Sequence, residues 1–231
     1  MTPMMRAGWI LTPDAGRAVL QRRCQYLIAI AAALAPLALT LSTTAPNAAL
    51  PVNPDLASPA SFTGQLLVAR PVLRDPNFQN SVIVIVHHDR NGALGIVINR
   101  PLQRVPIATL LDAFGIGAVD INGSVQVFAG GPVGRDAAFV LHTPDYRDGK
   151  TLDIDSRMAL SIGPDVLHAI GIGKGPRKSL VAFGYAGWSA AQLDGEIAGG
   201  FWDAVPDDPA LVFDDDRARV WQDARARTTD H

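Results

Sequence analysis

The group His87-His88-Asp89 joins three side chains of the types that bind zinc or iron. It follows an apolar run typical of a β-strand, and neighbouring strand residues point to opposite faces, so His87 and His88 cannot both reach one ion within a strand. Further ligands would have to come from His142 or His168. We therefore predict no metal site and no cofactor, with His88 and His142 as the residues to check. The favoured interpretation is that one histidine makes a buried hydrogen bond and the other faces solvent.

The glycine-rich stretch "GGPVGR", residues 130–135, could place backbone N–H groups and Arg135 around an anion. It lacks the Lys-Ser/Thr pair of a P-loop, and Pro132 removes one N–H donor. A turn between two strands explains it more simply. The sequence has no Gly-x-Ser-x-Gly motif, and its one cysteine, Cys24, lies far outside the central block. We predict no catalytic residue, and no Cys-based metal site or redox chemistry in the core.

The stretch "VAFGYAGWSAAQLDGEI", residues 181–197, can be interpreted in two ways. Its glycines suit a corner between a buried strand and a helix, where Tyr185 and Trp188 would supply apolar area. That structural interpretation is favoured. The functional alternative is that this corner and the Gly-Gly-Pro turn line one cleft for a ligand or a peptide. The candidate cleft residues are then Gly130, Gly131, Pro132, Tyr185 and Trp188.

A helix is expected directly after this corner. Ser189 and Gln192 have the spacing of a capping box, and the apolar residues that follow at intervals of four would share one face. Asp194 and Glu196 are two apart on that helix and diverge by about 200°, so they cannot work as a paired acid and base. The expected apolar face consists of Leu193, Ile197 and Phe201.

Short apolar runs rich in β-branched residues predict strands at 64–71, 81–88 and 93–99, and Asn91-Gly92 predicts a hairpin between the last two. Helices are expected after Pro106 and over the stretch that begins at Pro164. Hairpin-paired strands early and helix-separated strands later favour one α/β (α+β) domain over residues 61–228. We expect a mixed β-sheet flanked by helices.

Residues 1–60 are expected to lie outside this domain. Two arginines precede an apolar run at 26–41, and small and polar residues follow, which is the plan of a signal peptide. The run is short for a membrane span and contains Pro36. Residues 22–49 are therefore either an export signal or anchor, or part of an extension created by an upstream start codon. Residues 44–61 have the composition of a linker.

The charge distribution argues against direct binding to nucleic acid. The chain has a formal net charge of −2, and the block 61–202 is neutral, with no cluster of basic residues among aromatic ones. A basic surface is what sequence-independent binding to phosphate backbones requires. An unidentified protein partner or a small ligand is expected instead, and a membrane only if the N-terminal apolar segment is retained.

Three sequence blocks in this order, 64–101, 128–142 and 183–202, resemble the AlgH/YqgE family of bacterial proteins. The resemblance spans nearly all of residues 62–225. Two mild departures are Ala190, where the family usually has Gly, and Asp194, where Glu is expected. The residues that carry the resemblance are Pro71, Asp75, Phe78, His88, Gly92, Ala93, Gly95, Asn99, Pro101, Gly130, Gly131, Pro132, Leu141, His142, Gly184, Tyr185, Gly187, Trp188, Gln192, Leu193, Glu196 and Trp202.

The resemblance implies an α/β fold with a mixed, partly barrel-like sheet, a cytoplasmic location and no established enzymatic activity. Some members of the family are described as putative transcriptional regulators. We expect a non-enzymatic binding or regulatory protein that acts through protein or small-ligand contacts. The alternative is a hydrolase or metal-dependent enzyme that uses His88, His142 and Asp75, and it requires these three residues to converge.

Overall fold

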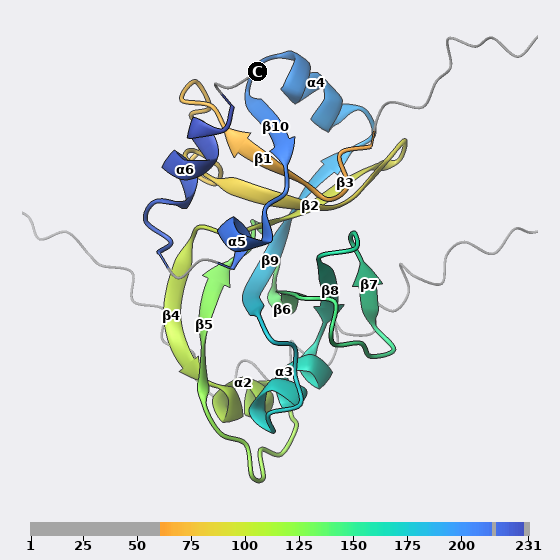
Figure 1. Cartoon of the computed structure of the whole chain (residues 1–231), viewed down its shortest axis with the longest axis vertical. Coiled ribbons are helices and arrows are strands. Elements are labelled where there is room, and N and C mark those ends of the chain that lie inside the picture. The colour runs from red at the N-terminus through yellow and green to blue at the C-terminus, as the bar shows by residue number, and fades with distance from the viewer. Residues whose placement is uncertain (1–60, 214–215, 229–231) are drawn as a thin grey trace, which may run out of the picture. The chain divides into compact units, whose positions relative to one another are not determined.

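The computed structural model describes residues 61–213 and 216–228 (Figure 1). Of these, residues 61–112 and 116–228 belong to one compact unit. The expected N-terminal extension, with its signal-like segment at 22–49, lies outside the described residues. Within the two described ranges, no helix is long and apolar enough to cross a membrane.

The described chain contains strands and short helices in mixed order. The strands are β1 (Gln65–Ala69), β2 (Val82–Asp89), β3 (Gly92–Val97), β4 (Pro101–Pro106), β5 (Ser124–Ala129), β6 (Val133–His142), β7 (Thr151–Asp153), β8 (Ala159–Ile162), β9 (Ser179–Ser189) and β10 (Trp202–Pro206). The helices are α2 (Ile107–Ala113), α3 (Pro164–Gly171), α4 (Gln192–Ala198), α5 (Pro209–Val212) and α6 (Val220–Ala226).

The strands form one curled, mixed sheet in the order β10-β1-β2-β3-β9-β6-β8-β7. All neighbours on this path are antiparallel, while β5 pairs in parallel with β9 and also carries β4. The long strand β9 joins the sheet together: its end at 186–189 pairs with β3, and its earlier part pairs with β5 and β6. Figure 1 shows β9 running from the β4–β5 pair toward β1, β2 and β3. The predicted fold class, an α/β domain with a partly barrel-like sheet, is confirmed.

The predicted hairpin between β2 and β3 is present, with Arg90 and Asn91 as its turn and Asp89 paired with Gly92. Gly92 is needed for a reason that the turn motif does not reveal. A Cβ atom at this position would lie 2.2 Å from the carbonyl oxygen of Trp188 on the adjoining strand. Glycine therefore allows β3 and β9 to pair closely at the corner before α4.

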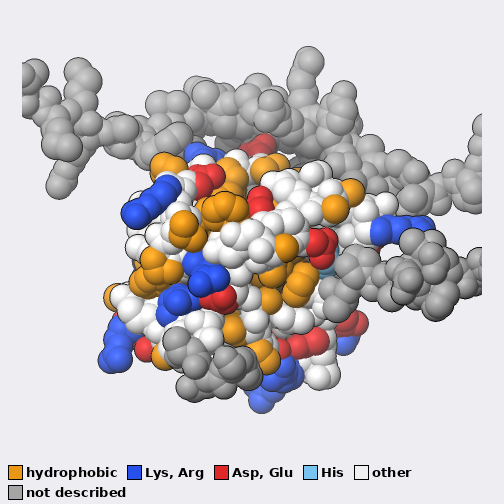
Figure 2. All heavy atoms as spheres, turned by 90° about the horizontal axis from the view of Figure 1, so that it is seen from above, with side chains coloured by type: hydrophobic (Ala, Val, Ile, Leu, Met, Phe, Trp, Pro, Cys, Tyr) orange, Lys and Arg blue, Asp and Glu red, His pale blue; other side chains and the backbone are white. Residues whose placement is uncertain are grey.

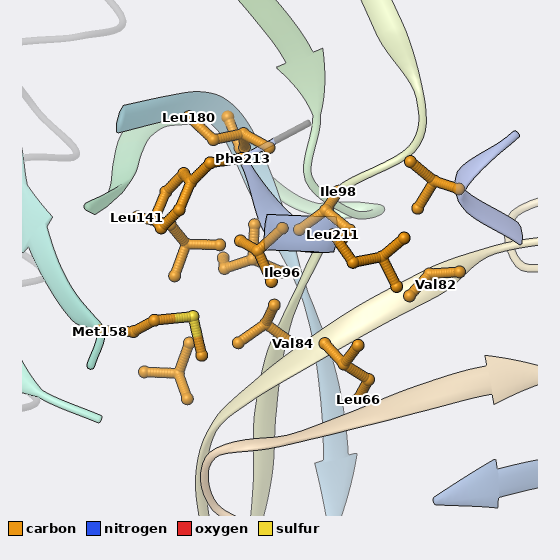
Figure 3. Packing of buried hydrophobic residues seen from close by; sticks show 14 of the residues in the cluster. Leu66, Val82, Val84, Ile96, Ile98, Leu141, Met158, Leu180, Leu211 and Phe213 are labelled. Atoms are coloured by element: carbon orange, nitrogen blue, oxygen red, sulfur yellow. The ribbon is translucent and has the colours of Figure 1, made fainter. Parts of the chain in front are cut away.

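Both faces of the sheet are buried, because strands β1 and β2 are apolar at consecutive positions. Leu66, Val82 and Val84 point into one core cluster, which Figure 3 shows with Leu141 of β6 and with Met158, the residue before β8. Leu67 and Ile83 point into a second cluster on the opposite face, which also contains Trp188, Leu193 and Trp202. This two-sided burial is what a continuous apolar run such as "VIVIV" indicates.

Different helices cover the two faces. Leu211 of α5, with Val220 and Ala224 of α6, closes the first cluster. Helix α6 is also fixed to β1, because the indole of Trp221 donates a hydrogen bond to the Ala69 carbonyl, 2.9 Å away. Helix α4 closes the second cluster through Leu193. The second cluster, under α4, is the one from which the candidate site is built.

Candidate functional site: the hollow between β9, α4 and β10

A hollow of about 240 Å³ opens between the end of β9, helix α4, the start of β10 and the loop 70–80 that joins β1 to β2. Figure 2 shows the face of the molecule that lies at the top of Figure 1, where hydrophobic and acidic side chains lie side by side. We call the hollow between β9, α4, β10 and loop 70–80 the Trp hollow. Its lining residues are Leu73, Asp75, Phe78, Gly187, Trp188, Gln192, Glu196, Phe201 and Trp202.

The carboxylate of Glu196 lies at the centre of the hydrogen bonds around the Trp hollow. Its Oε2 accepts from the indole N–H of Trp188 and from that of Trp202, both at 2.9 Å. Its Oε1 accepts from the Gln192 side-chain amide, also at 2.9 Å. An indole has one donor and no acceptor, so two nearly buried tryptophans need such a partner. Glu196 therefore ties the end of β9 and the start of β10 to α4.

The local sequence positions Glu196 through the first turn of α4. Gln192 lies one helical turn before Glu196, so the two side chains meet on one face. The Gln192 Oε1 atom accepts from the backbone N–H of Ser189, 3.1 Å away, which fixes the amide at the end of β9. The predicted capping role of Ser189 is wrong: β9 continues through Ser189, and the N-cap residue is Ala191, which has no side chain able to cap. The chain turns there through a left-handed backbone conformation, with φ of 59°.

Aromatic rings form the walls on the other sides. The ring of Phe78 is nearly parallel to that of Trp188, with centroids 6.4 Å apart, and meets Trp202 edge to face at 5.9 Å. The two indoles cross at 80°. Trp188 and Trp202 are 7% and 2% exposed, while Phe201 is 39% exposed. The hollow therefore has a rigid aromatic floor and a more accessible aromatic rim.

Loop 70–80 is held in place by the residues that follow β3. The Arg100 guanidinium donates to the carbonyls of Pro76 and Gln79 at 3.1 and 3.0 Å. The Asn99 amide donates to the Asn80 carbonyl at 2.8 Å and accepts from a backbone N–H of β2. These contacts fix the loop that carries Asp75 and Phe78. Asn99 and Arg100 of the first sequence block thus support the hollow without lining it, whereas Asp75 and Phe78 of the same block line it.

The sequence-predicted cleft residues do not all come together. Gly130 and Gly131 lie against Gly184 and Tyr185, so closely that a Cβ atom at Gly131 would be 2.1 Å from the Tyr185 carbonyl carbon. The Tyr185 ring, however, packs against Phe139 and the first core cluster. Trp188 belongs to the second cluster, on the opposite face of the sheet. Tyr185 and Trp188 are three residues apart on one strand, and such an odd separation places side chains on opposite faces.

His88 is buried and makes hydrogen bonds through its ring. Its Nδ1 accepts from the backbone N–H of Phe62 at 3.2 Å, and its Nε2 lies 3.4 Å from Asp194 Oδ2. The side chain of His88 is 2% exposed, whereas that of His87 is 59% exposed. This confirms the favoured interpretation of the histidine pair. His88 holds residues 61–63 against β2 and α4, since its backbone N–H also donates to the Thr63 hydroxyl.

His142 belongs to a different polar network inside the sheet. It is fully buried, with Nδ1 2.8 Å from the Thr143 carbonyl and Nε2 3.0 Å from the Ser161 hydroxyl. The chain of contacts continues from Ser161 to Thr151 and from Thr151 to Asp148. A hydroxyl as deeply buried as that of Ser161 has no access to a substrate. The network fixes the loop after β6 to the sheet.

The three residues of the alternative enzyme hypothesis thus have three separate surroundings. Asp75 lines the Trp hollow and caps its own turn by accepting from the backbone N–H of Asn77, while His88 and His142 bind other partners. Among the residues that the structure describes, no three His, Cys, Asp or Glu side chains form a group that could hold a metal ion.

Sequence reasoning did not identify the Trp hollow as a site. Trp188 was predicted as a cleft residue, but in a cleft shared with Tyr185 and the Gly-Gly-Pro turn, and Gln192, Glu196 and Trp202 were not predicted to belong to any site. Their types carried a usable signal: two buried indoles need acceptors, and a Glu one turn after a Gln on the intervening helix is a suitable one. What the spacing could not show was that loop 70–80 closes over the same place.

Comparisons with known proteins give a consistent answer. Residues 66–230 match the model of the family described as AlgH-like (DUF179). A UPF0301 protein of Methylococcus capsulatus is 44% identical over 165 residues, which cover 71% of this chain and 90% of that protein. A UPF0301 protein of Rhodospirillum rubrum is 46% identical over 153 residues, covering 66% of this chain and 80% of the relative.

Solved structures give the same result. The solution structure of the AlgH protein from Pseudomonas aeruginosa matches with a TM-score of 0.64 and 36% identity, over 76% of this chain and 92% of that one. A crystal structure of a Corynebacterium diphtheriae protein matches with a TM-score of 0.55 at 20% identity, over 71% of this chain and 85% of that one. At that identity the second likeness concerns the fold alone.

Proposed function

The chain belongs to the AlgH-like family, and from this premise and the geometry of the Trp hollow we propose that the protein is a non-enzymatic binding protein. The observation that carries the proposal is that side chains from two distant parts of the chain meet in one hollow. Loop 70–80 and the continuous segment 187–202, which runs from β9 through α4 to β10, lie more than 100 positions apart, yet side chains of both line one hollow beside the Glu196 carboxylate. Rigid aromatic walls with a few fixed polar groups are the usual composition of a ligand site.

The alternative, an enzyme using His88, His142 and Asp75, has less support. Catalysis by these groups needs them within reach of one reacting atom. Each instead makes hydrogen bonds in separate surroundings, and those of the two histidines are buried.

A regulatory role is compatible with this proposal if regulation follows from binding at the Trp hollow. We propose that such regulation acts through a small ligand or a protein contact, because the neutral block 61–202 lacks the basic surface that direct nucleic-acid binding requires. The cytoplasm is the compartment that we propose, on the family resemblance. Export or anchoring through residues 22–49 is the alternative.

A ligand screen on the full chain tests the proposal. Small cationic, neutral and anionic compounds are assayed by isothermal titration calorimetry, and we expect compounds from at least one set to bind. Phe201→Ala should weaken that binding by roughly fivefold or more, because it removes an accessible wall of the hollow. Ile172→Ala is the matched control: Ile172 is 41% exposed, close to the 39% of Phe201, and lies away from the hollow.

Equal effects of Phe201→Ala and Ile172→Ala on affinity would contradict the proposed location. Reproducible turnover by the purified protein in a broad hydrolase screen, lost when a residue lining the hollow is changed, would contradict the non-enzymatic assignment.

A further inference from the structure

The Trp hollow has an uncompensated negative charge. The three groups that donate to Glu196 are two indoles and an amide, and all are neutral. Among the described residues, no Lys, Arg or His forms an ion pair with Glu196. The nearby base Arg70 pairs with Asp203 at 3.8 Å. A half-buried carboxylate without a cation is an incomplete electrostatic arrangement, because burial weakens its interaction with water.

The second acidic group of the hollow, Asp75, leaves the charge of the hollow negative. It lies near the Arg100 guanidinium, whose pKa is lowered by burial and raised by the charge of Asp75. The guanidinium donates to the carbonyls of Pro76 and Gln79 and does not line the hollow. None of the lining residues is basic. The field inside the hollow is therefore negative, and an anionic ligand is disfavoured.

The aromatic walls act in the same direction. Phe78, Trp188, Phe201 and Trp202 line the same hollow as the carboxylate, and the faces of such rings attract cations through their quadrupole. A hollow of about 240 Å³ is smaller than the roughly 300–1,000 Å³ typical of drug-sized ligands, so it suits a head group rather than a large molecule. The shape and the electrostatics thus fit a small organic cation.

The hydrogen-bonding capacity of Glu196 narrows the kind of cation. Its Oε2 already accepts two indole N–H groups, and its Oε1 accepts one amide N–H. One lone pair on Oε1 remains, so a ligand can gain at most one further hydrogen bond in the lone-pair directions. A guanidinium prefers two parallel bonds to both oxygens of a carboxylate, which this arrangement blocks. A quaternary ammonium head group needs no hydrogen bond, and a primary one can use the single free lone pair and leave its other N–H groups to water.

We propose that the Trp hollow binds the alkylammonium head group of a small molecule, with Glu196 as the counter-charge and the rings of Phe78 and Phe201 as cation–π partners. This inference rests on the proposed binding function and adds the chemical class of the ligand. Phe78 comes from loop 70–80 and Phe201 from the turn before β10, so the two rings can contact one ligand from different sides.

The test compares two probes of nearly equal shape, choline and its neutral isostere 3,3-dimethyl-1-butanol, on the full ¹⁵N-labelled chain. The indole N–H resonances of Trp188 and Trp202 report on the hollow, and that of Trp221, which donates to Ala69, is the internal control. We expect choline to shift the first two resonances and to bind about tenfold or more tightly than the isostere, because only the charge differs. Methylguanidinium should bind more weakly than choline.

Two variants make the assignment specific. Glu196→Gln keeps an oxygen that can accept from both indoles and removes the charge, so choline affinity should fall about tenfold or more. Asp112→Asn removes one negative charge from the exposed end of α2, and it should change the affinity less than about twofold because solvent and salt screen that charge.

Equal affinity for choline and its isostere would overturn the proposal, and this comparison needs no variant to fold. Unchanged choline binding in a folded Glu196→Gln protein would also overturn it, as would tighter binding of methylguanidinium. If only neutral or anionic compounds shift the Trp188 and Trp202 resonances, the cation inference fails and the proposed binding function stands. If no compound shifts them, both fail.

Discussion

Replacement of Trp188 tests whether the corner between β9 and α4 is a structural element as well as a wall of the hollow. Trp188 is 7% exposed, packs against Phe78 and Trp202, and donates to Glu196. Removing a buried large aromatic typically costs about 3–5 kcal/mol, so Trp188→Ala should lower the free energy of unfolding by that amount. This is a large share of the roughly 5–15 kcal/mol stability of a domain. Urea denaturation followed by circular dichroism measures it without relying on tryptophan fluorescence.

Two further substitutions separate the contribution of the Trp188 ring volume from those of its hydrogen bond and of the neighbouring Ser189 hydroxyl. Trp188→Phe keeps most of the apolar volume and removes the hydrogen bond to a charged acceptor, so it should cost about 1.5–3 kcal/mol. Ser189→Ala should cost about 0.5 kcal/mol or less, because the exposed Ser189 hydroxyl contacts the Gln192 side chain and caps no backbone group. A nearly neutral Trp188→Ala that still abolished ligand binding would refute the reasoning and make the corner a recognition surface only.

Three further outcomes are expected. Ala191→Gly should stabilise the domain by about 0.5 kcal/mol in the same urea assay, because relief of a left-handed backbone at φ 59° outweighs the added freedom of the unfolded chain; a loss of stability would contradict this. Burial and then the charge of Asp155 raise the pKa of Asp207 from 3.8 to about 6, although Arg157 opposes this. Between about pH 4 and pH 6 the folded state therefore keeps a proton that the unfolded chain has lost. The free energy of unfolding of the unchanged protein, measured relative to that of Asp207→Asn, should be highest below about pH 4 and fall by roughly 1–3 kcal/mol as the pH rises to about 6. A difference between the two proteins that does not change with pH would exclude the effect. N-terminal sequencing of the native protein distinguishes the two interpretations of residues 22–49: an export signal predicts a mature terminus near Leu50 in an exported fraction, and an extension from an upstream start codon predicts a start near Ser61.

Much of the fold could be predicted from the sequence because the signals were local. The apolar runs of β1, β2 and β3 and the turn residue Asn91 specify a hairpin-paired sheet buried on both faces. The start of α3 at Pro164 is equally local, since proline is tolerated in a first helical turn.

The start of α4 was mispredicted because a local motif competes there with pairing between distant strands. Ser189 and Gln192 have capping-box spacing, but pairing with β3 extends β9 through Ser189. The helix then begins only after Ala191. The backbone of Ala191 is in a left-handed conformation, which is unfavourable for alanine. Tertiary pairing thus prevailed over the local motif.

The candidate site could not be assembled from spacing, because its parts meet only through the sheet. The order of β10, β1 and β2 brings Trp202 beside loop 70–80, about 125 positions away in the chain. The separation of Tyr185 from Trp188, in contrast, follows from strand alternation and could have been predicted from their three-residue spacing.

A crystal structure of the full chain with its tightest ligand from the screen tests the central claim most directly. The account predicts the ligand in the Trp hollow, with its cationic group beside Glu196 Oε1, in contact with the rings of Phe78 and Phe201, and with both indole hydrogen bonds to Oε2 intact. A ligand bound elsewhere on the surface, with the Trp hollow empty in the same crystal, would contradict it.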